Sequence, residues 1–395
     1  MACVICTLNY KDDDMSERFN SCSNKERISG VTISICLYIM LMMLQTPVMR
    51  IGMMTAFSTI IIVILACVFS GKQALERFVM TNGSGVLVIF AFHLFITTIA
   101  QNGIQMEMLE VLAMLIVTVF LCGIQVTDKE DNAIRWALIL AVTVYAILTI
   151  RSCVANQAMR YYHGGIRLFG TEFDPNYIGI PFVAATVLLI ENMLRGRRVV
   201  ISGVCYGVIA VAIVYTASRG NMITWGVSNA MVMFFFLKDR SVTIGKKFFW
   251  CMAAIVLLII LVVMLSSNFE QQWTRMTIIE EGSDNGRFDL WETSLGVWKR
   301  NPIFGVGYNG MLKSAGAVSH NTYLQILTET GILGFCLLLI FAFQLLINTF
   351  RSNRSCFCVL LALFIQIMFL DTLSSRCLWA IIGWCVLQRD ETMKK

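Results

Sequence analysis

Three polar motifs in this sequence carry residue types that could catalyse a reaction. Arg219 lies between two long apolar runs, Arg287 follows a glycine in a second motif, and His320 precedes an asparagine in a third. An arginine stays protonated and binds phosphate oxygens in pairs. A histidine titrates near neutral pH and can act as a general base. Together they predict a site in which two arginines bind an anionic leaving group while His320 activates a hydroxyl.

Both arginines also have a simpler interpretation. Arg219 lies in a very short connection between two predicted spans. An arginine there lies at membrane depth, where a charge is usually functional. The alternative for Arg219 is a side chain that only extends to the membrane surface. The alternative for Arg287 is a surface ion pair with Asp284 or Asp289.

A polar stripe follows His320 along an otherwise apolar helix. Its residues recur at i, i+4, i+7 and i+8 and are Asn321, Gln325, Thr328 and Glu329. Such a stripe faces the interior of a helix bundle or a wet cavity. His93 lies in an apolar run and is predicted to be a packed, hydrogen-bonded histidine, whereas His163, in a loop, is ambiguous.

The elements that must position these residues are membrane helices. Of the 395 residues, 57% are hydrophobic and 14% are charged, against about 25% charged in soluble domains. Uncharged runs reach the length of a spanning helix. The sequence predicts an all-α, polytopic integral membrane protein of about twelve transmembrane helices with a large outer loop. The predicted spans are 28–46, 51–71, 78–106, 107–127, 133–150, 177–194, 199–218, 220–237, 248–269, 330–350, 355–372 and 374–388.

Basic residues predict the orientation and the domain limits. With the N-terminus in the cytoplasm, 20 of the 31 Lys and Arg residues fall in inner segments, which is the positive-inside pattern. The prediction is a cytoplasmic polar tail at 1–27, one transmembrane domain at 28–390 and a short inner tail at 391–395. The two outer loops are 151–176 and 268–319, and the first helix is an uncleaved anchor.

The longer outer loop has a helical pattern of its own. Its apolar positions are spaced i, i+3, i+7 and i+10 and are Phe288, Trp291, Leu295 and Trp298. Asp284 or Asn285 could cap this helix and Pro302 would end it. It is predicted to lie at the membrane interface or to pack on neighbouring helices, and these interpretations are compatible. The basic residues of the outer loops favour an anionic partner or, equally, a solvated surface.

Gly305, Gly307 and Gly310 have the spacing of a dinucleotide-binding fingerprint. That fingerprint works only between a β-strand and a helix, and no alternation of strands and helices is predicted. We therefore interpret the glycines as a sharp turn before the next span, and we expect no cofactor.

The outer face restricts the chemistry of the donor. No ATP or nucleotide sugar is expected there, so an activated donor must arrive through the lipid bilayer. A polyprenyl-pyrophosphate-linked glycan fits, and two arginines with one histidine could transfer it without a metal. The acidic cluster of Glu280, Glu281, Asp284 and Asp289 is either a metal site or a solvated loop.

The cysteines leave two questions open. Cys3 and Cys6 form a single C-x-x-C pair with no second pair. A metal or redox role for that pair is therefore weakly supported. Cys153 and Cys377 are both predicted near outer helix ends and could form a disulfide.

The ordered set of motifs resembles the O-antigen ligase/polymerase superfamily. These motifs surround Arg219, Arg287, Gly305 with Gly307, and His320 with Asn321. The resemblance implies that both arginines bind the donor pyrophosphate and that His320 activates or positions the acceptor hydroxyl. Asn321 would orient the imidazole or contact the acceptor, and Glu329 is a further supporting candidate.

An earlier stretch also resembles a loop of this superfamily. It contains Arg167, Asp174 and Asn176, which we take as supporting residues. The simpler interpretation is that Asp174 caps a helix with Pro175 in its first turn.

The function that the resemblance implies is a glycan polymerase of the bacterial cytoplasmic membrane, with its site on the periplasmic or extracellular side. Its partners would be the lipid-linked donor, a glycan acceptor, the bilayer, a chain-length regulator and a flippase, but no nucleic acid. The alternative is a ligase that transfers the glycan to lipid A core, protein or a wall polymer. A twelve-helix transporter is disfavoured because the sequence shows no internal repeat.

Overall fold

The computed structural model describes residues 28–48, 81–155, 166–168, 171–173, 175–216, 218–253, 255 and 287–389. Within these ranges the chain is mostly helical, as predicted. The helices are α2 (Gly30–Val48), α5 (Asn82–Asn102), α6 (Met106–Gly123), α7 (Asp128–Ala155), α8 (Pro175–Leu194), α9 (Val199–Tyr215), α10 (Arg219–Lys238), α13 (Arg287–Trp298), α14 (Gly310–Ala315), α15 (Thr322–Ser352), α16 (Arg354–Gln366), η2 (Ile367–Phe369) and α17 (Arg376–Val386). A further helix covers residues 244–253.

Six of the described helices are long and apolar enough to cross a membrane, namely α5, α6, α7, α8, α10 and α15. Four shorter apolar helices, α2, α9, α16 and α17, coincide with further predicted spans. The predicted span 51–71 and most of 248–269 lie outside the described residues. The total of about twelve spans therefore stays a prediction, while the helical class is confirmed.

Two small sheets are the exceptions to the all-α class. Strands β2 (Ile166–Leu168) and β3 (Thr171–Phe173) form an antiparallel pair within the predicted loop 151–176. Strands β1 (Gln125–Val126) and β4 (Gln388–Arg389) pair in parallel. Sequence reasoning missed both, because strands of two or three residues are too short to show an alternating pattern.

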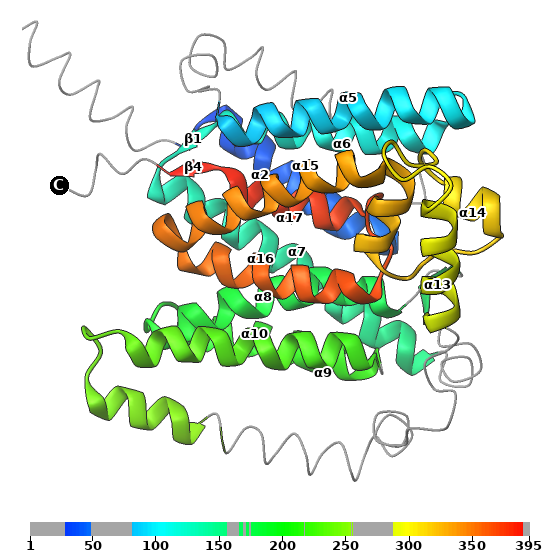
Figure 1. The fold of residues 1–395 in the computed structure, drawn as a ribbon. Coiled ribbons are helices and arrows are strands. Elements are labelled where there is room, and N and C mark those ends of the chain that lie inside the picture. Colours follow the sequence, from blue (N-terminus) through cyan, green and yellow to red (C-terminus); the bar gives the residue numbers. More distant parts are fainter. Residues whose placement is uncertain are drawn as a thin grey trace, which may run out of the picture.

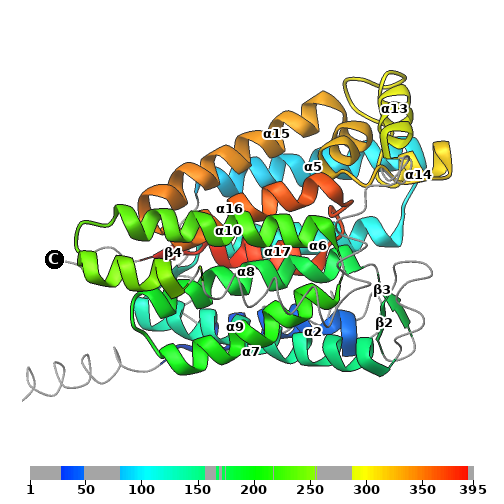
Figure 2. The same ribbon diagram turned by 90° about the horizontal axis from the view of Figure 1, so that it is seen from below.

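The helices lie side by side, so the molecule has two distinct ends (Figures 1 and 2). One end carries α13, α14 and the β2–β3 pair, and we call it the loop end. The other carries β1 and β4, and we call it the strand end. The described segments of both loops predicted to be outside therefore lie at the same end.

Side-chain caps explain where several helices begin. Ser218 accepts a hydrogen bond from the Asn221 amide at the start of α10, and Ser375 accepts one from Leu378 at the start of α17. At the start of α16, Asn353 accepts from the Cys356 amide. Each cap satisfies a backbone amide that has no partner within its helix.

A buried ionic cluster fixes the strand end. The Asp131 carboxylate accepts hydrogen bonds from Arg135 Nε (2.8 Å), Arg389 Nη2 (3.0 Å) and Trp384 Nε1 (3.0 Å). Arg135 also pairs with Glu191 at 3.1 Å. The members of this cluster come from α7, α8, α17 and β4. Because a buried charge without a partner is costly, these four elements must stay packed together.

Cys153 and Cys377 do not form the disulfide that the sequence left open. Neither sulfur is part of a disulfide, and Cys377 Sγ lies 3.2 Å from the carbonyl oxygen of Met42. Cys3 and Cys6 lie outside the described residues.

Helix α13 confirms the helix predicted in the outer loop. Its buried residues are Ser294 and Val297, while Phe288 and Leu295 of the apolar stripe are exposed. Thr328 Oγ1 donates to the Ser294 carbonyl at 3.4 Å, which joins α13 to α15. The helix therefore packs through its small residues and leaves two stripe residues exposed. The proposed caps Asp284 and Asn285 lie outside the described residues.

Helix α15 is broken at Gly331, where φ is 64° and ψ is −173°. In an unbroken helix, the carbonyls of Thr328 and Glu329 would accept from amides four residues later. Here they accept from the loop that follows α13 instead. Val306 N donates to Thr328 O at 3.0 Å, and Gly307 N donates to Glu329 O at 2.9 Å.

The same loop satisfies the amides on the other side of the break. Ile332 N donates to Pro302 O at 2.9 Å, and Leu333 N donates to Ile303 O at 3.3 Å. Two helical hydrogen bonds are thus exchanged for four bonds to residues 302–307. Backbone groups without water need such partners, so the break in the span depends on the loop.

Side chains from α5 hold the broken region in place. His93 Nε2 lies 2.7 Å from the carbonyl oxygen of Thr330, which confirms the prediction of a hydrogen-bonded histidine. Asn102 Nδ2 donates to the carbonyls of Val306 (2.8 Å) and Tyr308 (3.2 Å). The loop is therefore fixed on both α15 and α5.

The glycines of this loop are required by close backbone contacts. Gly305 has φ 81°, and a Cβ there would lie 2.4 Å from the amide nitrogen of Gly331. Gly307 has φ 79°, and its Cβ would lie 2.7 Å from Asn102 Nδ2. Both conformations disfavour other residues. In the structure, the G-x-G-x-x-G stretch is a turn that packs against the break in α15.

We predict that Gly305→Ala destabilises the protein far more than Gly316→Ala. Gly316 also has a positive φ of 68°, but a Cβ there would meet nothing within 4 Å. Its substitution should therefore cost only backbone strain, about 1 kcal/mol, whereas Gly305→Ala adds a clash with backbone and should cost on the order of 3 kcal/mol. Thermal unfolding of the detergent-purified variants measures both. An equal loss in the two variants would contradict the docked turn.

Candidate active site at the loop end

His320 lies directly before α15, where the chain makes a sharp turn. Its φ of 48° is in the left-handed region, which is uncommon outside glycine. The next residue, Asn321, caps α15: its Oδ1 accepts from the amides of Tyr323 (3.0 Å) and Leu324 (3.2 Å). The predicted supporting residue Asn321 thus fixes the helix start that carries His320.

The Asp371 carboxylate holds the His320 turn. Asp371 Oδ1 accepts from Ser319 Oγ at 2.5 Å, and Oδ2 accepts from the His320 amide at 2.6 Å. The same Oδ2 lies 3.7 Å from His320 Nδ1. The Asp371 side chain is 8% exposed, while the His320 side chain is 37% exposed. One carboxylate therefore positions the backbone and faces one ring nitrogen of a histidine that solvent can reach.

This pair has the elements of a general base. At 3.7 Å the Asp371 carboxylate and His320 Nδ1 are too far apart for a hydrogen bond but close enough to interact electrostatically. A carboxylate near Nδ1 favours a proton there and stabilises the imidazolium that forms when Nε2 takes a proton. The arrangement can accept a proton from a hydroxyl that approaches Nε2.

Asp371 is itself held from two helices. Tyr177 OH of α8 donates to the Asp371 carbonyl at 2.8 Å. Thr322 Oγ1 of α15 donates to the Leu370 carbonyl at 2.5 Å and accepts from the Thr372 amide at 3.0 Å. The segment between η2 and α17 is therefore bound to the starts of α8 and α15.

Asp371 was missed by sequence reasoning. It follows the apolar run of α16, 51 positions after His320, and belongs to no motif in the sequence. A signal existed, because a carboxylate at the end of a predicted span is costly and often functional. Its contact with His320, however, could not be predicted from the spacing of residues along the sequence.

Arg219 is the first residue of α10 and is half-buried. The preceding Ser218 donates to Asn176 Oδ1, so the predicted supporting residue Asn176 joins the starts of α8 and α10. A Cβ on Gly220 would lie 3.6 Å from the ring of Phe369, two residues before Asp371. The turn that carries Arg219 therefore packs against the segment that leads to Asp371.

A rigid polar contact supports this turn. Asn221 lies against Gly179, where a Cβ would approach Asn221 Cγ to 2.1 Å. Gln366 Nε2 donates to Asn221 Oδ1 at 2.9 Å. Helices α8, α10 and α16 meet at this asparagine, so the position of Arg219 is set by three helices.

Arg287 is the first residue of α13 and is also half-buried. Four residues later, Trp291 Nε1 donates to the Ser319 carbonyl at 3.1 Å, next to His320. Residues four apart share one face of a helix. Arg287 therefore lies on the face of α13 that contacts the His320 turn.

The remaining predicted residues lie elsewhere. Glu329 is buried, and its Oε1 accepts from the Asn309 amide at 3.0 Å, so it holds the glycine loop. Nine residues of helix put it about 13 Å from His320 along the axis. Arg167 pairs with Glu172 in the β2–β3 register, but its side chain, like the whole of Asp174, lies outside the described residues.

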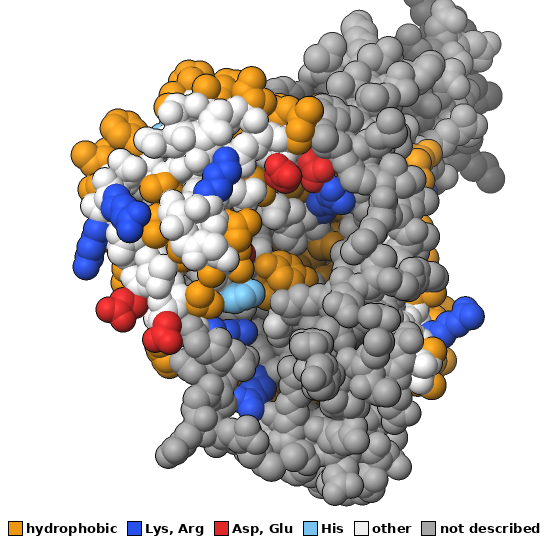
Figure 3. Space-filling view, turned by 90° about the vertical axis from the view of Figure 1, so that its right-hand side faces the viewer, with side chains coloured by type: hydrophobic (Ala, Val, Ile, Leu, Met, Phe, Trp, Pro, Cys, Tyr) orange, Lys and Arg blue, Asp and Glu red, His pale blue; other side chains and the backbone are white. Residues whose placement is uncertain are grey.

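The surface of the loop end is hollowed. Lys and Arg side chains and a histidine gather around the hollow (Figure 3). Among the residues that the structure describes, no group of three or more His, Cys, Asp or Glu side chains could hold a metal ion. Of the acidic cluster, Asp289 is exposed on α13, and Glu280, Glu281 and Asp284 lie outside those residues.

The central part of this chain is similar to a known protein family. Residues 204–339 match a family described as O-Antigen ligase. No curated protein matches the chain. The matched range includes Arg219, Arg287 and His320, while Asn176 and Asp371 lie outside it. This match and the apolar helices support a membrane protein whose central part is similar to the O-antigen ligase/polymerase superfamily.

Proposed function

We propose that this protein transfers a glycan from polyprenyl pyrophosphate to a sugar hydroxyl. One observation carries the proposal: Asp371 holds His320 at the start of α15, next to the helix starts that bear Arg219 and Arg287. A base and two permanent cations are the groups that this transfer needs. The O-antigen ligase match supports a glycosyltransferase of the membrane.

In the proposed reaction the acceptor hydroxyl loses its proton to His320 Nε2 as its oxygen attacks the anomeric carbon. The bond from that carbon to the pyrophosphate oxygen breaks, and the leaving group departs with the bonding electrons. Arg219 and Arg287 stabilise its charge through paired N–H donors. Asp371 stabilises the imidazolium. No metal enters this scheme.

Polymerisation is the reaction that we favour, with a lipid-linked repeat unit of O-antigen, capsule or exopolysaccharide as the acceptor. The family description, O-Antigen ligase, keeps ligation to another acceptor as the second candidate. The surface glycan of a deletion strain separates the two. Single repeat units on the acceptor indicate a missing polymerase, and long polymer left on the lipid carrier indicates a missing ligase.

We place the reaction on the outer side of the bacterial cytoplasmic membrane. His320 lies at the loop end, and three described basic connections, 195–198, 239–243 and 351–353, lie at the strand end, which supports this orientation by the positive-inside rule. A flippase that delivers the donor and a chain-length regulator would act with the protein there.

We expect His320→Ala and Arg219→Ala each to abolish detectable glycan transfer. Loss of a general base costs about 10²–10⁴-fold, and loss of a charge at a developing anion costs about 10²–10³-fold. Complementation of a deletion strain, followed by gel analysis of its glycan, measures transfer. Arg240→Ala is the control, because Arg240 is an exposed arginine that follows α10 at the strand end. Normal glycan from either site variant in correctly inserted protein would refute the assignment.

Asp371→Asn should reduce the turnover rate on the order of 10²-fold and alter its pH profile. The amide can still accept from the His320 backbone but cannot stabilise an imidazolium. Assays of purified protein with a lipid-linked donor measure the rate and the profile. Asp239→Asn, at an exposed position of the strand end, serves as the control. A normal profile with reduced protein yield would mean that Asp371 has a purely structural role.

We expect EDTA to leave the transfer rate unchanged, since the proposed scheme uses only side chains. The assay compares chelated protein with protein supplied with Mg²⁺ or Mn²⁺. Loss of activity on chelation, restored by one of these ions, would instead favour the acidic cluster around Asp289.

A further inference from the structure

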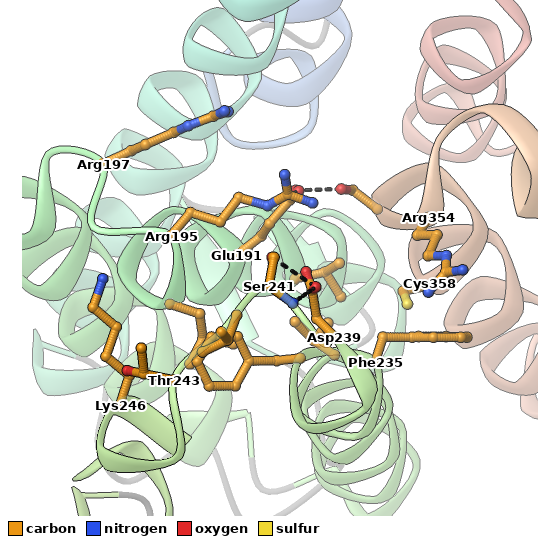
Figure 4. Close-up of a pocket in the computed structure, with 16 residues that line it drawn as sticks. Glu191, Arg195, Arg197, Phe235, Asp239, Ser241, Thr243, Lys246, Arg354 and Cys358 are labelled. Atoms are coloured by element: carbon orange, nitrogen blue, oxygen red, sulfur yellow. Dashed lines mark hydrogen bonds and ion pairs between the residues drawn. The ribbon is translucent and has the colours of Figure 1, made fainter. Parts of the chain in front are cut away.

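A second cavity lies at the strand end, far from His320. Its volume is about 400 Å³, and it opens between the ends of α8 and α10, the turn at 239–243 and the start of α16 (Figure 4). Nothing in the proposed glycan transfer uses this cavity.

Cations outnumber carboxylates in its lining. The cations are Arg195, Arg197, Lys246 and Arg354, and the carboxylates are Glu191 and Asp239. Both carboxylates have partners of their own. Glu191 pairs with Arg135 and Arg195 and accepts from Ser355, while Asp239 accepts from the amide (2.9 Å) and hydroxyl (2.7 Å) of Ser241.

Three cations remain for an anionic ligand. Among the described residues, no carboxylate forms an ion pair with Arg197, Lys246 or Arg354. The Arg354 guanidinium lies over the rings of Phe235 (5.3 Å) and Phe350 (6.0 Å). Stacking occupies the faces of a guanidinium and leaves its edge donors able to bind phosphate oxygens. In Figure 4, Lys246 and Arg354 lie on opposite sides of the cavity.

The other half of the lining is apolar. Val187, Val232 and Phe236 are buried side chains of α8 and α10 that face this cavity. Such an apolar surface would not contribute to the binding of a small soluble anion, because the affinity for that anion comes from charge and hydrogen bonds alone. A cavity lined by both cations and apolar side chains suits a ligand with a phosphate and a hydrocarbon chain.

The exposed side chains of the helix at 244–253 indicate that such a ligand would enter from the membrane surface. Ile244, Phe248 and Phe249 are 85%, 68% and 63% exposed and flank Lys246. Exposed apolar and aromatic side chains next to a lysine are typical of the boundary between a bilayer and water. The cavity therefore borders the membrane surface.

We propose that this cavity binds an anionic phospholipid of the leaflet at the strand end. Its charged headgroup would lie in the cavity between Arg354 and Lys246, with the phosphate accepting from the edge donors of Arg354, and part of an acyl chain would cover the apolar residues of α8 and α10. Basic pockets between membrane helices bind anionic lipid headgroups in this way. The site is separate from the glycan site, so it does not depend on the proposed reaction.

The test uses the full-length purified protein and native mass spectrometry. Phosphatidylglycerol and phosphatidylcholine with identical acyl chains are added in equal amounts, and the retained lipid is identified. Each cation near the surface contributes about 1 kcal/mol, so Lys246→Gln with Arg354→Gln should reduce retained phosphatidylglycerol at least about tenfold. The control, Arg240→Gln with Arg351→Gln, removes two exposed cations of the same end that do not line the cavity.

Selective retention of phosphatidylglycerol that only the cavity variant loses would support the proposal. Lys246→Gln alone leaves the stacking of Arg354 intact and should give a smaller loss in the same direction. Equal retention in both double variants, or equal retention of phosphatidylcholine, would overturn it. Displacement of the lipid by millimolar inorganic phosphate would also overturn it, because the site would then be one for soluble phosphate.

Discussion

The exchange of backbone hydrogen bonds at Gly331 is the constraint on which the loop end depends. A break inside an apolar helix leaves carbonyls and amides without partners, and a bilayer offers no water to satisfy them. Residues 302–307 supply all four partners, from Pro302 O to the Gly307 amide. The helix cannot keep its break without the loop, and the loop has no other means of approaching α15 so closely. Because α13 leads into this loop, the position of Arg287 follows from the same exchange.

Asp371 extends this constraint to the chemistry. Its carboxylate binds the His320 turn, and its carbonyl binds Tyr177 of α8, which starts beside Asn176 and hence beside the α10 cap. Three helix starts, those of α8, α10 and α15, thus converge on one short segment between η2 and α17. Helix starts present the positive ends of helix dipoles, which favour an anion. The proposed site for a pyrophosphate leaving group therefore needs few residues beyond those that already hold the helices together.

At the strand end, charged side chains stabilise the packing of the helices. There Asp131 compensates Arg135 and Arg389, so these cations stabilise the packing of α7, α17 and β4. The basic residues of the nearby cavity are exposed, and three of them have no such compensation among the described residues. Positive charge at this end thus has two roles: it is neutralised where it is buried, and it faces the membrane surface where it is exposed. The proposed lipid site follows from the second role.

The sequence by itself predicted most of the helices, the short helix of the outer loop, the candidate residues His320 and Arg219, and the resemblance to the O-antigen ligase/polymerase superfamily. Periodicity, uncharged length and local motifs carry that information, because each depends on residues close together in the chain. Asp371, the β2–β3 pair and the true reason for Gly305 were decided only by the tertiary structure. Asp371 meets a histidine 51 positions away, and Gly305 touches the backbone at Gly331. A fingerprint spacing can be read in a sequence, but the contact that requires a glycine exists only when two distant segments pack together.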